Sequence, residues 1–214
     1  NLNRGIYKSC NTYFSNVYRR IIDKDNKVEE NINNWHKHLN SFGLGNYLGY
    51  DHPVGQPGYV PNANFYNLWY PNQRWRGSTI VSNAIGQGEI LMTPIQLANV
   101  AATIANRGFF YTPHFVKGIQ GDFIDPKYKT KRATSISKEH FTNVIEGMAD
   151  VVSKGTARVA AIRGIEVCGK TGTIENFTKI DGVRTQLTDH SIFIAFAPKD
   201  DPKIALAVIV VNGY

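Results

Sequence analysis

Val167-Cys168-Gly169-Lys170-Thr171-Gly172-Thr173-Ile174 places one lysine, two hydroxyl side chains and two glycines in a short apolar run. Together with Gly164, the run fits G-x-x-x-x-G-K-[ST], the pattern of a phosphate-binding loop. Its central Lys-Thr-Gly also fits a strand motif of serine acyl-transfer enzymes. The two interpretations require different folds, so the rest of the chain has to decide between them.

Composition sets broad limits on the class of protein. The chain has 214 residues, of which 42% are hydrophobic and 19% charged, as is usual for a globular domain. No apolar run reaches the roughly 20 residues that a membrane helix needs. The net charge of +7 is spread along the sequence without a nucleic-acid-binding motif, so we expect a solvated basic surface and no nucleic-acid partner.

Cysteine and histidine usage gives no metal site. The two cysteines, Cys10 and Cys168, are too few for a tetrahedral zinc site. They could form one disulfide, but we interpret them as small packing residues. His36 and His38 are two positions apart in a helical stretch and therefore point in different directions. We expect neither a metal nor a cofactor.

Helical patterns dominate the first two thirds of the chain. The spacing of Phe14, Val17, Tyr18, Ile21 and Ile22 predicts a helix after Ser9-Cys10-Asn11-Thr12, and a second helix is expected from about Glu29 to Phe42, ended by Gly43. Periodicity fades over 43–92, and so long an irregular segment is often functional. The simpler interpretation is a surface connection with aromatic plugs at Tyr66, Trp69 and Trp75.

The next helix has several agreeing signals. Thr93 is a suitable N-cap, Pro94 follows in the first turn, and Gln96 completes a capping box. We expect its buried stripe to contain Leu97, Val100, Ala101, Ile104 and Ala105. The sequence of residues 109–134 predicts short extended segments and a polar turn. Another helix is expected after an N-cap at Ser137, with Phe141, Val144, Ile145, Met148 and Val152 facing inward.

The last third changes to strand patterns. We expect strands at 166–174, 191–197 and 203–211, with a polar loop at 175–190. The last two form an antiparallel hairpin around the Pro198–Pro202 turn. Helices followed by neighbouring antiparallel strands predict an α+β fold, an antiparallel sheet with packed helices.

This order argues against a phosphate-binding loop. Such a loop needs a strand before its first glycine and a helix starting at its Gly-Lys-Thr. Here Ile165-Glu166-Val167-Cys168 has a strand pattern, and no helical pattern follows Thr171. A P-loop NTPase is therefore a remote alternative. The acyl-transfer interpretation is favoured because Ser9-Cys10-Asn11 supplies an upstream S-x-N element in the required order.

Five stretches together resemble class B penicillin-binding proteins, and in particular their elongation type. They are Ser9–Phe14 (SCNTYF), Ala84–Pro94 (AIGQGEILMTP), Val152–Ala157 (VSKGTA), Cys168–Thr173 (CGKTGT) and Asp189–Pro198 (DHSIFIAFAP). The resemblance covers nearly the whole chain in family order. It implies that residues 1–214 are the C-terminal part of a penicillin-binding protein/β-lactamase-like transpeptidase domain, incomplete at both ends. The implied parent is a peptidoglycan D,D-transpeptidase that forms an acyl-serine enzyme.

The resemblance assigns catalytic roles to three residues. Ser9 would relay a proton between the lysine beside the nucleophile, Lys170 and the leaving amine, because a hydroxyl both donates and accepts. Asn11 would hold the substrate amide and orient that lysine. Lys170 would place positive charge near Ser9 and the terminal carboxylate of the substrate.

Three neighbouring residues are implied to bind substrate. Thr171 and Thr173 would offer hydroxyls to the substrate carboxylate. Gly172, without a side chain, would let a peptide lie against the strand edge as an added strand. The backbone N–H of Thr173 would form half of the oxyanion hole.

The S-x-x-K nucleophile of this family lies well before S-x-N, and only eight residues precede Ser9. We therefore expect the nucleophilic serine outside residues 1–214 and an inactive isolated fragment. Ser135-Ile136-Ser137-Lys138 fits S-x-x-K but falls between the other two elements, so we interpret it as a helix start. The family continues past its last strand into a helix, and we expect one sheet face here to be uncovered.

The resemblance also implies partners and a location. The substrates would be peptidoglycan stem peptides on a lipid-linked precursor, and β-lactam antibiotics would bind. The parent would be anchored in the inner membrane, with this domain in the periplasm, and associated with cell-wall elongation proteins. A serine β-lactamase and a β-lactam-sensing receptor domain remain alternatives, although the sequence identifies no base for deacylation.

Overall fold

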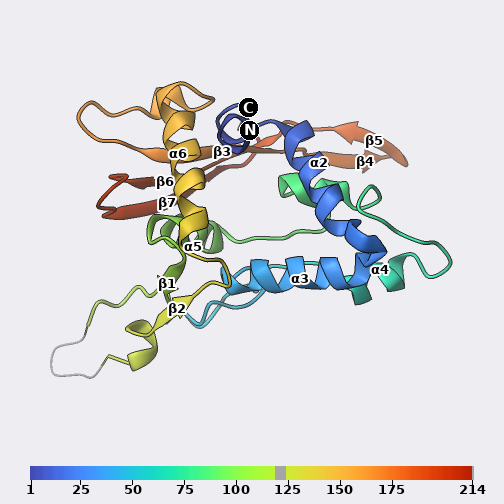
Figure 1. Cartoon of the computed structure of the whole chain (residues 1–214), viewed down its shortest axis with the longest axis horizontal. Helices are drawn as coiled ribbons and strands as arrows, with labels where there is room; N and C mark the ends of the chain where they lie inside the picture. Colours follow the sequence, from blue (N-terminus) through green and yellow to red (C-terminus); the bar gives the residue numbers. More distant parts are fainter. Residues whose placement is uncertain (119–123, 214) are drawn as a thin grey trace.

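The computed structural model describes residues 1–118 and 124–213. Short helices and three small antiparallel sheets alternate with long connections, which confirms an α+β fold (Figure 1). The α-helices are α1 (Leu2–Tyr7), α2 (Asn11–Ile22), α3 (Val28–Ser41), α4 (Ala63–Trp69), α5 (Pro94–Ala105) and α6 (Glu139–Ser153). The strands are β1 (Phe109–Tyr111), β2 (Lys131–Ala133), β3 (Cys168–Ile174), β4 (Phe177–Ile180), β5 (Val183–Gln186), β6 (His190–Ala197) and β7 (Ile204–Val210).

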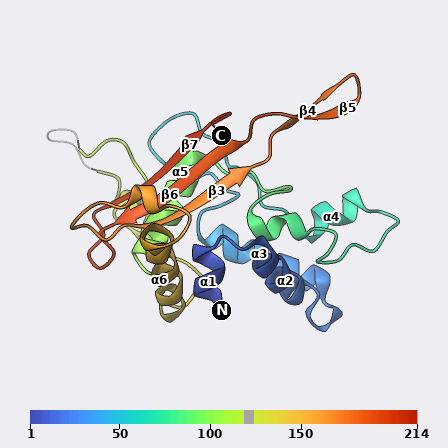
Figure 2. The same ribbon diagram turned by 90° about the horizontal axis from the view of Figure 1, so that it is seen from above.

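The main sheet has the order β3-β6-β7, and both pairs are antiparallel. The predicted hairpin of the last two strands is confirmed, with Ala197 opposite Ile204 beside the turn. Helix α6 packs against β3, whereas α5 packs against β7 (Figure 2). Strand β3 is thus the edge of this sheet, and its other long side is free of β-pairing among the described residues.

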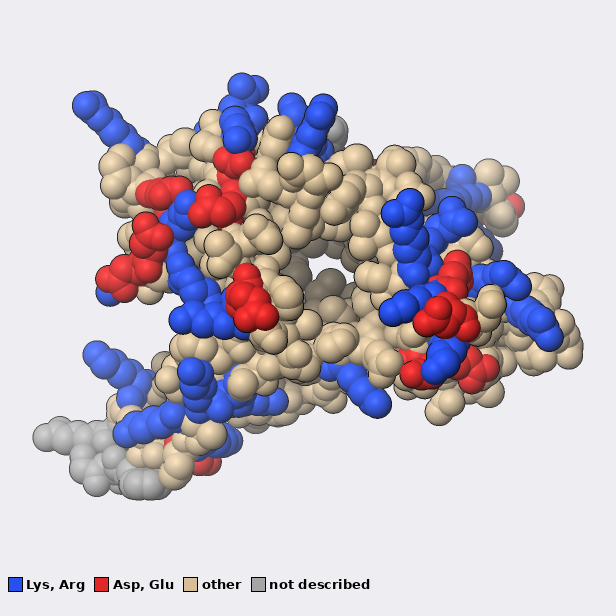
Figure 3. Space-filling model, viewed as in Figure 1, with Lys and Arg blue, Asp and Glu red and all other residues tan. Residues whose placement is uncertain are grey.

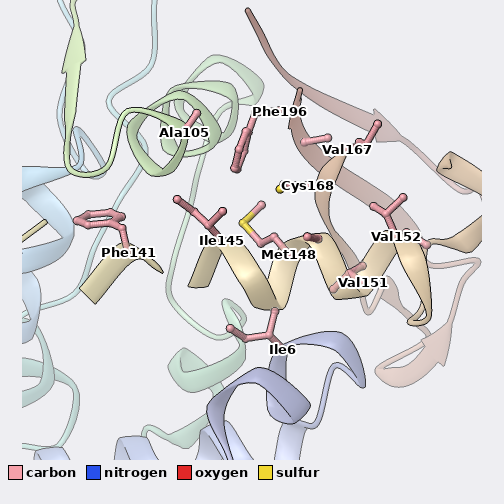
Figure 4. Packing of buried hydrophobic residues seen from close by; sticks show 13 residues of the cluster. Ile6, Ala105, Phe141, Ile145, Met148, Val151, Val152, Val167, Cys168 and Phe196 are labelled. Atoms are coloured by element: carbon pink, nitrogen blue, oxygen red, sulfur yellow. The ribbon is translucent and has the colours of Figure 1, made fainter. Parts of the chain in front are cut away.

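The core lies between α6 and this sheet. Figure 4 shows the apolar side of α6 facing β3, β6, α5 and α1. Four of its five predicted inward residues, Phe141, Ile145, Met148 and Val152, are at most 4% exposed. Cys168 is fully buried in the same cluster, and both cysteines are free thiols, so the packing interpretation is confirmed for Cys168 and no disulfide forms.

A second apolar cluster joins α2, α3 and α4 on the opposite side of the molecule. Tyr18, Ile22, Ile32, Tyr66 and Trp75 are buried in it. The two predicted helices are confirmed, with α3 one residue earlier at each end than expected. Gly43 follows the cap residue of α3 with φ +84°, a left-handed conformation that glycine adopts without strain.

The connection 43–92 is more ordered than its sequence suggested. It contains α4 and the 3₁₀ helix η2 (Val81–Ile85). Tyr66 and Trp75 are buried plugs as expected, but Trp69 is 66% exposed, so its assignment as a plug was wrong. The aromatic-rich sequence of α4 hides its apolar period, although Asn62 caps the helix by accepting from the Phe65 N–H.

Helix α5 has the predicted capping box, but its buried face differs from the predicted stripe. Ala101 and Ala105 are buried with the polar residues Gln96, Asn99 and Thr103. Gln96 Nε2 donates to three carbonyl oxygens of the 43–57 segment, those of Gly43, Asn46 and Pro57, at 2.8–3.2 Å. The polar side chains are therefore buried because they satisfy the backbone of a long connection.

Three further predictions need correction. Leu2–Tyr7 form α1, a helix that the sequence patterns did not predict. The expected loop at 175–190 contains the β4–β5 hairpin. Ser137 does not cap α6, because Lys138 holds the cap position and no side-chain cap hydrogen bond is present. Within 109–134 the expected extended pieces are β1 and β2, and residues 119–123 lie outside the described part.

One face of the main sheet carries exposed apolar side chains. Ile204, Leu206, Val208 and Val210 alternate along β7 and are 38–64% exposed. The helices α5 and α6 cover the opposite face through Phe196 and its neighbours. The expectation of an uncovered face is confirmed for the described residues.

The surface is mixed in charge. Figure 3 shows Lys and Arg spread over both halves of the molecule, with acidic residues among them. The same view shows an opening between the α5–α6 half and the α2–α3 half. No helix in the described ranges is long and apolar enough to cross a membrane.

Candidate active site

The S-x-N and K-T-G elements meet at the free edge of β3. Lys170 Nζ lies 2.7 Å from Ser9 Oγ and donates a hydrogen bond to it. A second hydrogen bond, 2.6 Å long, joins Lys170 Nζ to the carbonyl oxygen of Thr171. The structure thus brings together two residues that are 161 positions apart and that the sequence analysis had paired.

Burial changes the acidity of this lysine. Desolvation is the cause that lowers the pKa of Lys170 below its ordinary value of 10.5, because burial disfavours the charged form. A lysine with a lowered pKa releases its proton more readily at neutral pH. Next to a hydroxyl that can donate and accept, it suits proton transfer between groups.

Ser9 is presented by the turn between α1 and α2. Its backbone has φ +49°, an uncommon left-handed conformation for a serine. Hydrogen bonds from Ser9 N to Ile6 O and from Cys10 N to Gly5 O close the turn. Helix α1 packs against α6, and Cys10 rather than Ser9 occupies the N-cap position of α2. Ser9 is therefore not a helix cap, and its hydroxyl is available to Lys170.

Two carbonyls show which groups of β3 face its free edge. The carbonyl of Thr171 accepts from Lys170 Nζ, and that of Thr173 accepts from Gln87 Nε2 at 3.2 Å. In an antiparallel strand the N–H and C=O of one residue point to the same side, and alternate residues share that side. The N–H of Thr173 therefore also faces the free edge, as an oxyanion-hole donor would require.

Gly172 and Thr171 differ in their surroundings. Gly172 is exposed, and a Cβ atom added there would meet only Ile192 Cβ, at 3.6 Å. Thr171 Oγ1 lies 2.8 Å from Thr156 Oγ1, which comes from the segment after α6. Thr156 was not predicted as a site residue, although it lies in the recognised VSKGTA stretch.

Asn11 is the predicted residue with the least structural support. It is the first residue of α2 and is exposed. In the ranges 1–118 and 124–213, no hydrogen bond joins its side chain to Ser9 or Lys170. It lies two positions after Ser9 in the sequence, at the start of α2.

The other two motif matches do not form sites of the expected kind. Strand β3 runs through Lys170 and Thr171, so no helix begins there and the phosphate-binding loop is excluded. Ser135 Oγ bonds His38 Nδ1 at 2.7 Å and Ser41 Oγ at 3.0 Å, on the end of α3. These contacts tie the S-x-x-K match to α3 rather than to the lysine at its end.

Comparison with known proteins places the chain in a family. The model of the penicillin binding protein transpeptidase domain matches residues 1–214. The chain therefore belongs to the family of penicillin-binding protein transpeptidase domains, which agrees with its fold and with the Ser9–Lys170 pair.

Its relatives include named elongation-type enzymes. A "Peptidoglycan D,D-transpeptidase MrdA" of Acinetobacter baumannii is 31% identical over 227 residues, which is 100% of this chain and 32% of that protein. The MrdA protein of Haemophilus influenzae is also 31% identical, over 99% of this chain and 33% of its own length. This chain thus spans about a third of the length of these relatives.

Solved structures of the same type share its fold. The structure of Pseudomonas aeruginosa PBP2 in complex with WCK 5153 gives a TM-score of 0.77 at 31% identity, covering 99% of this chain and 43% of that one. The structure of PBP2 from Helicobacter pylori gives a TM-score of 0.75 at 30% identity, covering 100% of this chain and 36% of that one.

Proposed function

We propose that residues 1–214 are the C-terminal part of the transpeptidase domain of a peptidoglycan D,D-transpeptidase and carry its S-x-N and K-T-G elements. The observation that carries the proposal is the hydrogen bond between Lys170 Nζ and Ser9 Oγ at the free edge of β3, in a chain of the transpeptidase family. The relatives named D,D-transpeptidases support the same activity.

The chemistry is acyl transfer in two steps. A serine outside residues 1–214 attacks the carbonyl between the two D-Ala residues of a stem peptide, so that a serine ester forms and the peptide bond breaks. The attacking serine gives its proton to the lysine beside it, and the leaving D-Ala amine takes up a proton that Ser9 passes on from its hydrogen-bonded partner Lys170. An amine of a second stem peptide then attacks the ester, forms the cross-link and frees the serine.

Substrate binding uses the edge of β3. The outward N–H of Thr173 stabilises the oxyanion as the tetrahedral intermediate forms. Thr171 and Thr173 hydroxyls, with Lys170, bind the terminal carboxylate, while the bare Gly172 lets the peptide approach. Asn11 holds a substrate amide from the end of α2. The same groups bind β-lactams, which mimic the D-Ala-D-Ala unit.

The nucleophile is supplied by the rest of the parent protein. The opening between the two halves of the molecule offers room for that part (Figure 3). We place the parent in the inner membrane, with this domain in the periplasm. A solved complex between PBP2 and MreC from Helicobacter pylori, 29% identical over 100% of this chain, supports association with cell-wall elongation proteins.

Acylation kinetics of the full-length protein test the proposal. We expect Lys170→Ala to abolish labelling by a fluorescent penicillin while leaving the melting temperature nearly unchanged, because the lysine contributes charge rather than packing. Lys179→Ala, an exposed lysine of β4, is the matched control and should label like the wild type. Unchanged labelling of Lys170→Ala would overturn the proposal, and a short-lived adduct in the wild type would favour a β-lactamase instead.

A further inference from the structure

The side chain of Gln87 reaches from the α2–α3 half of the molecule to the edge of β3. Its Nε2 donates to the carbonyl oxygen of Thr173 at 3.2 Å, across 86 positions of sequence. No other residue of 82–89, which we call the Gln87 loop, makes a side-chain hydrogen bond to β3 among the described residues. The contact therefore rests on one flexible side chain.

The backbone of the Gln87 loop is held in place. Gly86 and Gly88 flank Gln87 with φ of +76° and +74°, conformations that glycine adopts freely. Gln87 N donates to Ser82 O at 3.1 Å. Only the side chain of Gln87 can therefore leave Thr173 without rebuilding the loop.

A buried polar network anchors both ends of this loop. Asn83, only 4% exposed, donates through Nδ2 to the hydroxyls of Tyr66 and Tyr18, at 2.6 and 3.3 Å. Tyr66 in turn donates to Glu89 Oε2 at 2.9 Å. Burial is the largest cause that raises the pKa of both tyrosines, so the hydroxyls stay protonated and the network keeps its donors.

The carbonyl that Gln87 binds is one that an added strand would use. A peptide that extends a sheet pairs with the outward N–H and C=O groups of the edge strand. On β3 these groups include the C=O of Thr173, because the carbonyls of the alternate residues Thr171 and Thr173 both face the free edge. The Gln87 amide donates to the carbonyl that the N–H of such a peptide would use.

We propose that Gln87 is a latch on the acyl-donor site, which the donor peptide displaces when it binds to β3. This inference rests on the proposed function, because it assigns a use to the same edge. The peptide N–H replaces the Gln87 amide on Thr173 O, so one neutral hydrogen bond is exchanged for another. The latch lowers apparent affinity for the donor and leaves the chemical step unchanged.

The test separates binding from chemistry in the full-length protein. Gln87→Met keeps the approximate length of the side chain and removes the donor, while the exposed Gln73→Met is the matched control. Stopped-flow labelling over a range of fluorescent penicillin concentrations gives an apparent dissociation constant and a limiting acylation rate. We expect Gln87→Met to tighten the dissociation constant roughly threefold to tenfold, the effect of one neutral hydrogen bond, without changing the limiting rate.

Three results would overturn the latch. An unchanged dissociation constant would show that Gln87 does not compete for the edge, and a weaker one would show that it contacts the bound donor instead. A tighter dissociation constant in Gln73→Met as well would also overturn it, since the effect would not be specific to the residue at the edge of β3. Wild-type labelling that depends on Lys170 establishes the proposed function separately, so these outcomes bear on Gln87 alone.

Discussion

At the scale of single residues, the site depends on a partly buried lysine. Lys170 has neutral oxygen partners, the Ser9 hydroxyl and the Thr171 carbonyl, and its pKa is lowered by desolvation. A paired carboxylate would have the opposite effect and fix the proton on the lysine. The arrangement therefore favours transfer of the proton over its retention.

The lowered pKa predicts a specific pH dependence of stability. Between the lowered pKa of folded Lys170 and the ordinary value of 10.5, the unfolded state binds more protons than the folded state. The stability of the protein therefore rises with pH in that window. Below the pKa of folded Lys170, the folded state carries the full destabilisation that comes from burying the lysine charge. Denaturant unfolding measures this as the free energy of unfolding of the wild type minus that of Lys170→Met. We expect this difference to increase as the pH rises toward 10.5. Lys179→Met serves as control, and a difference independent of pH would contradict the account.

Two glycines of β3 should respond differently to the same substitution. In Gly169→Ala the new Cβ would lie 2.5 Å from Phe193 Cζ, so we expect a loss of about 1–3 kcal/mol in the free energy of unfolding from overpacking. In Gly172→Ala the nearest atom is 3.6 Å away, and stability should change by no more than about 0.5 kcal/mol. Its penicillin labelling should nevertheless slow, because the methyl group lies at the donor site. Denaturation and labelling of both variants check this, and equal stability losses would refute it.

At the scale of elements, local signals decided what could be predicted. Helix α5 begins where Thr93, Pro94 and Gln96 indicated, because capping depends on neighbouring residues only. The β6–β7 hairpin was equally readable from two strand patterns on either side of the Pro198–Pro202 turn. The β4–β5 hairpin was missed although Asp181-Gly182, a favoured two-residue turn, lies between its strands with φ of +51° and +79°. Its polar strands weakened the alternating pattern.

Gln96 shows how tertiary structure adds a role to a local interpretation. The sequence identifies it as part of a capping box, which the structure confirms, and the structure also buries it as the support of the 43–57 segment. We expect Gln96→Ala to lower the free energy of unfolding by about 2–4 kcal/mol, because each buried carbonyl left unpaired costs about 1–3 kcal/mol. Gln73→Ala, at an exposed position, should cost no more than about 0.5 kcal/mol. Similar values for both variants in denaturant unfolding would contradict this assignment.

Parts of the site could not be predicted from the sequence for a related reason. The pairing of Ser9 with Lys170 followed from motif resemblance, and no local pattern connects residues so far apart. The contacts of Thr156 with Thr171 and of Gln87 with Thr173 depend on how loops return to β3. Their stretches were recognised, but which side chain reaches the strand is set by packing of α6 and of the buried network around Asn83.

At the scale of the whole molecule, each of the two halves is stabilised by its own apolar cluster, and β3 faces the space between the halves. One cluster fixes α6 under the main sheet, and the other joins α2, α3 and α4. Ser9 lies at the turn where α1, packed on α6, passes into α2. The Ser9–Lys170 pair is thus positioned by both halves, and we propose that the serine to be acylated comes from a further part of the parent protein.

The most direct test of this account is to locate the acylated residue. The full-length protein is incubated with penicillin, digested, and analysed by mass spectrometry, with Lys170→Ala treated in parallel. We predict one penicilloyl adduct, on a serine outside residues 1–214, that is absent from Lys170→Ala. An adduct on Ser9, on Ser135 or on any other residue of 1–214 would contradict the account.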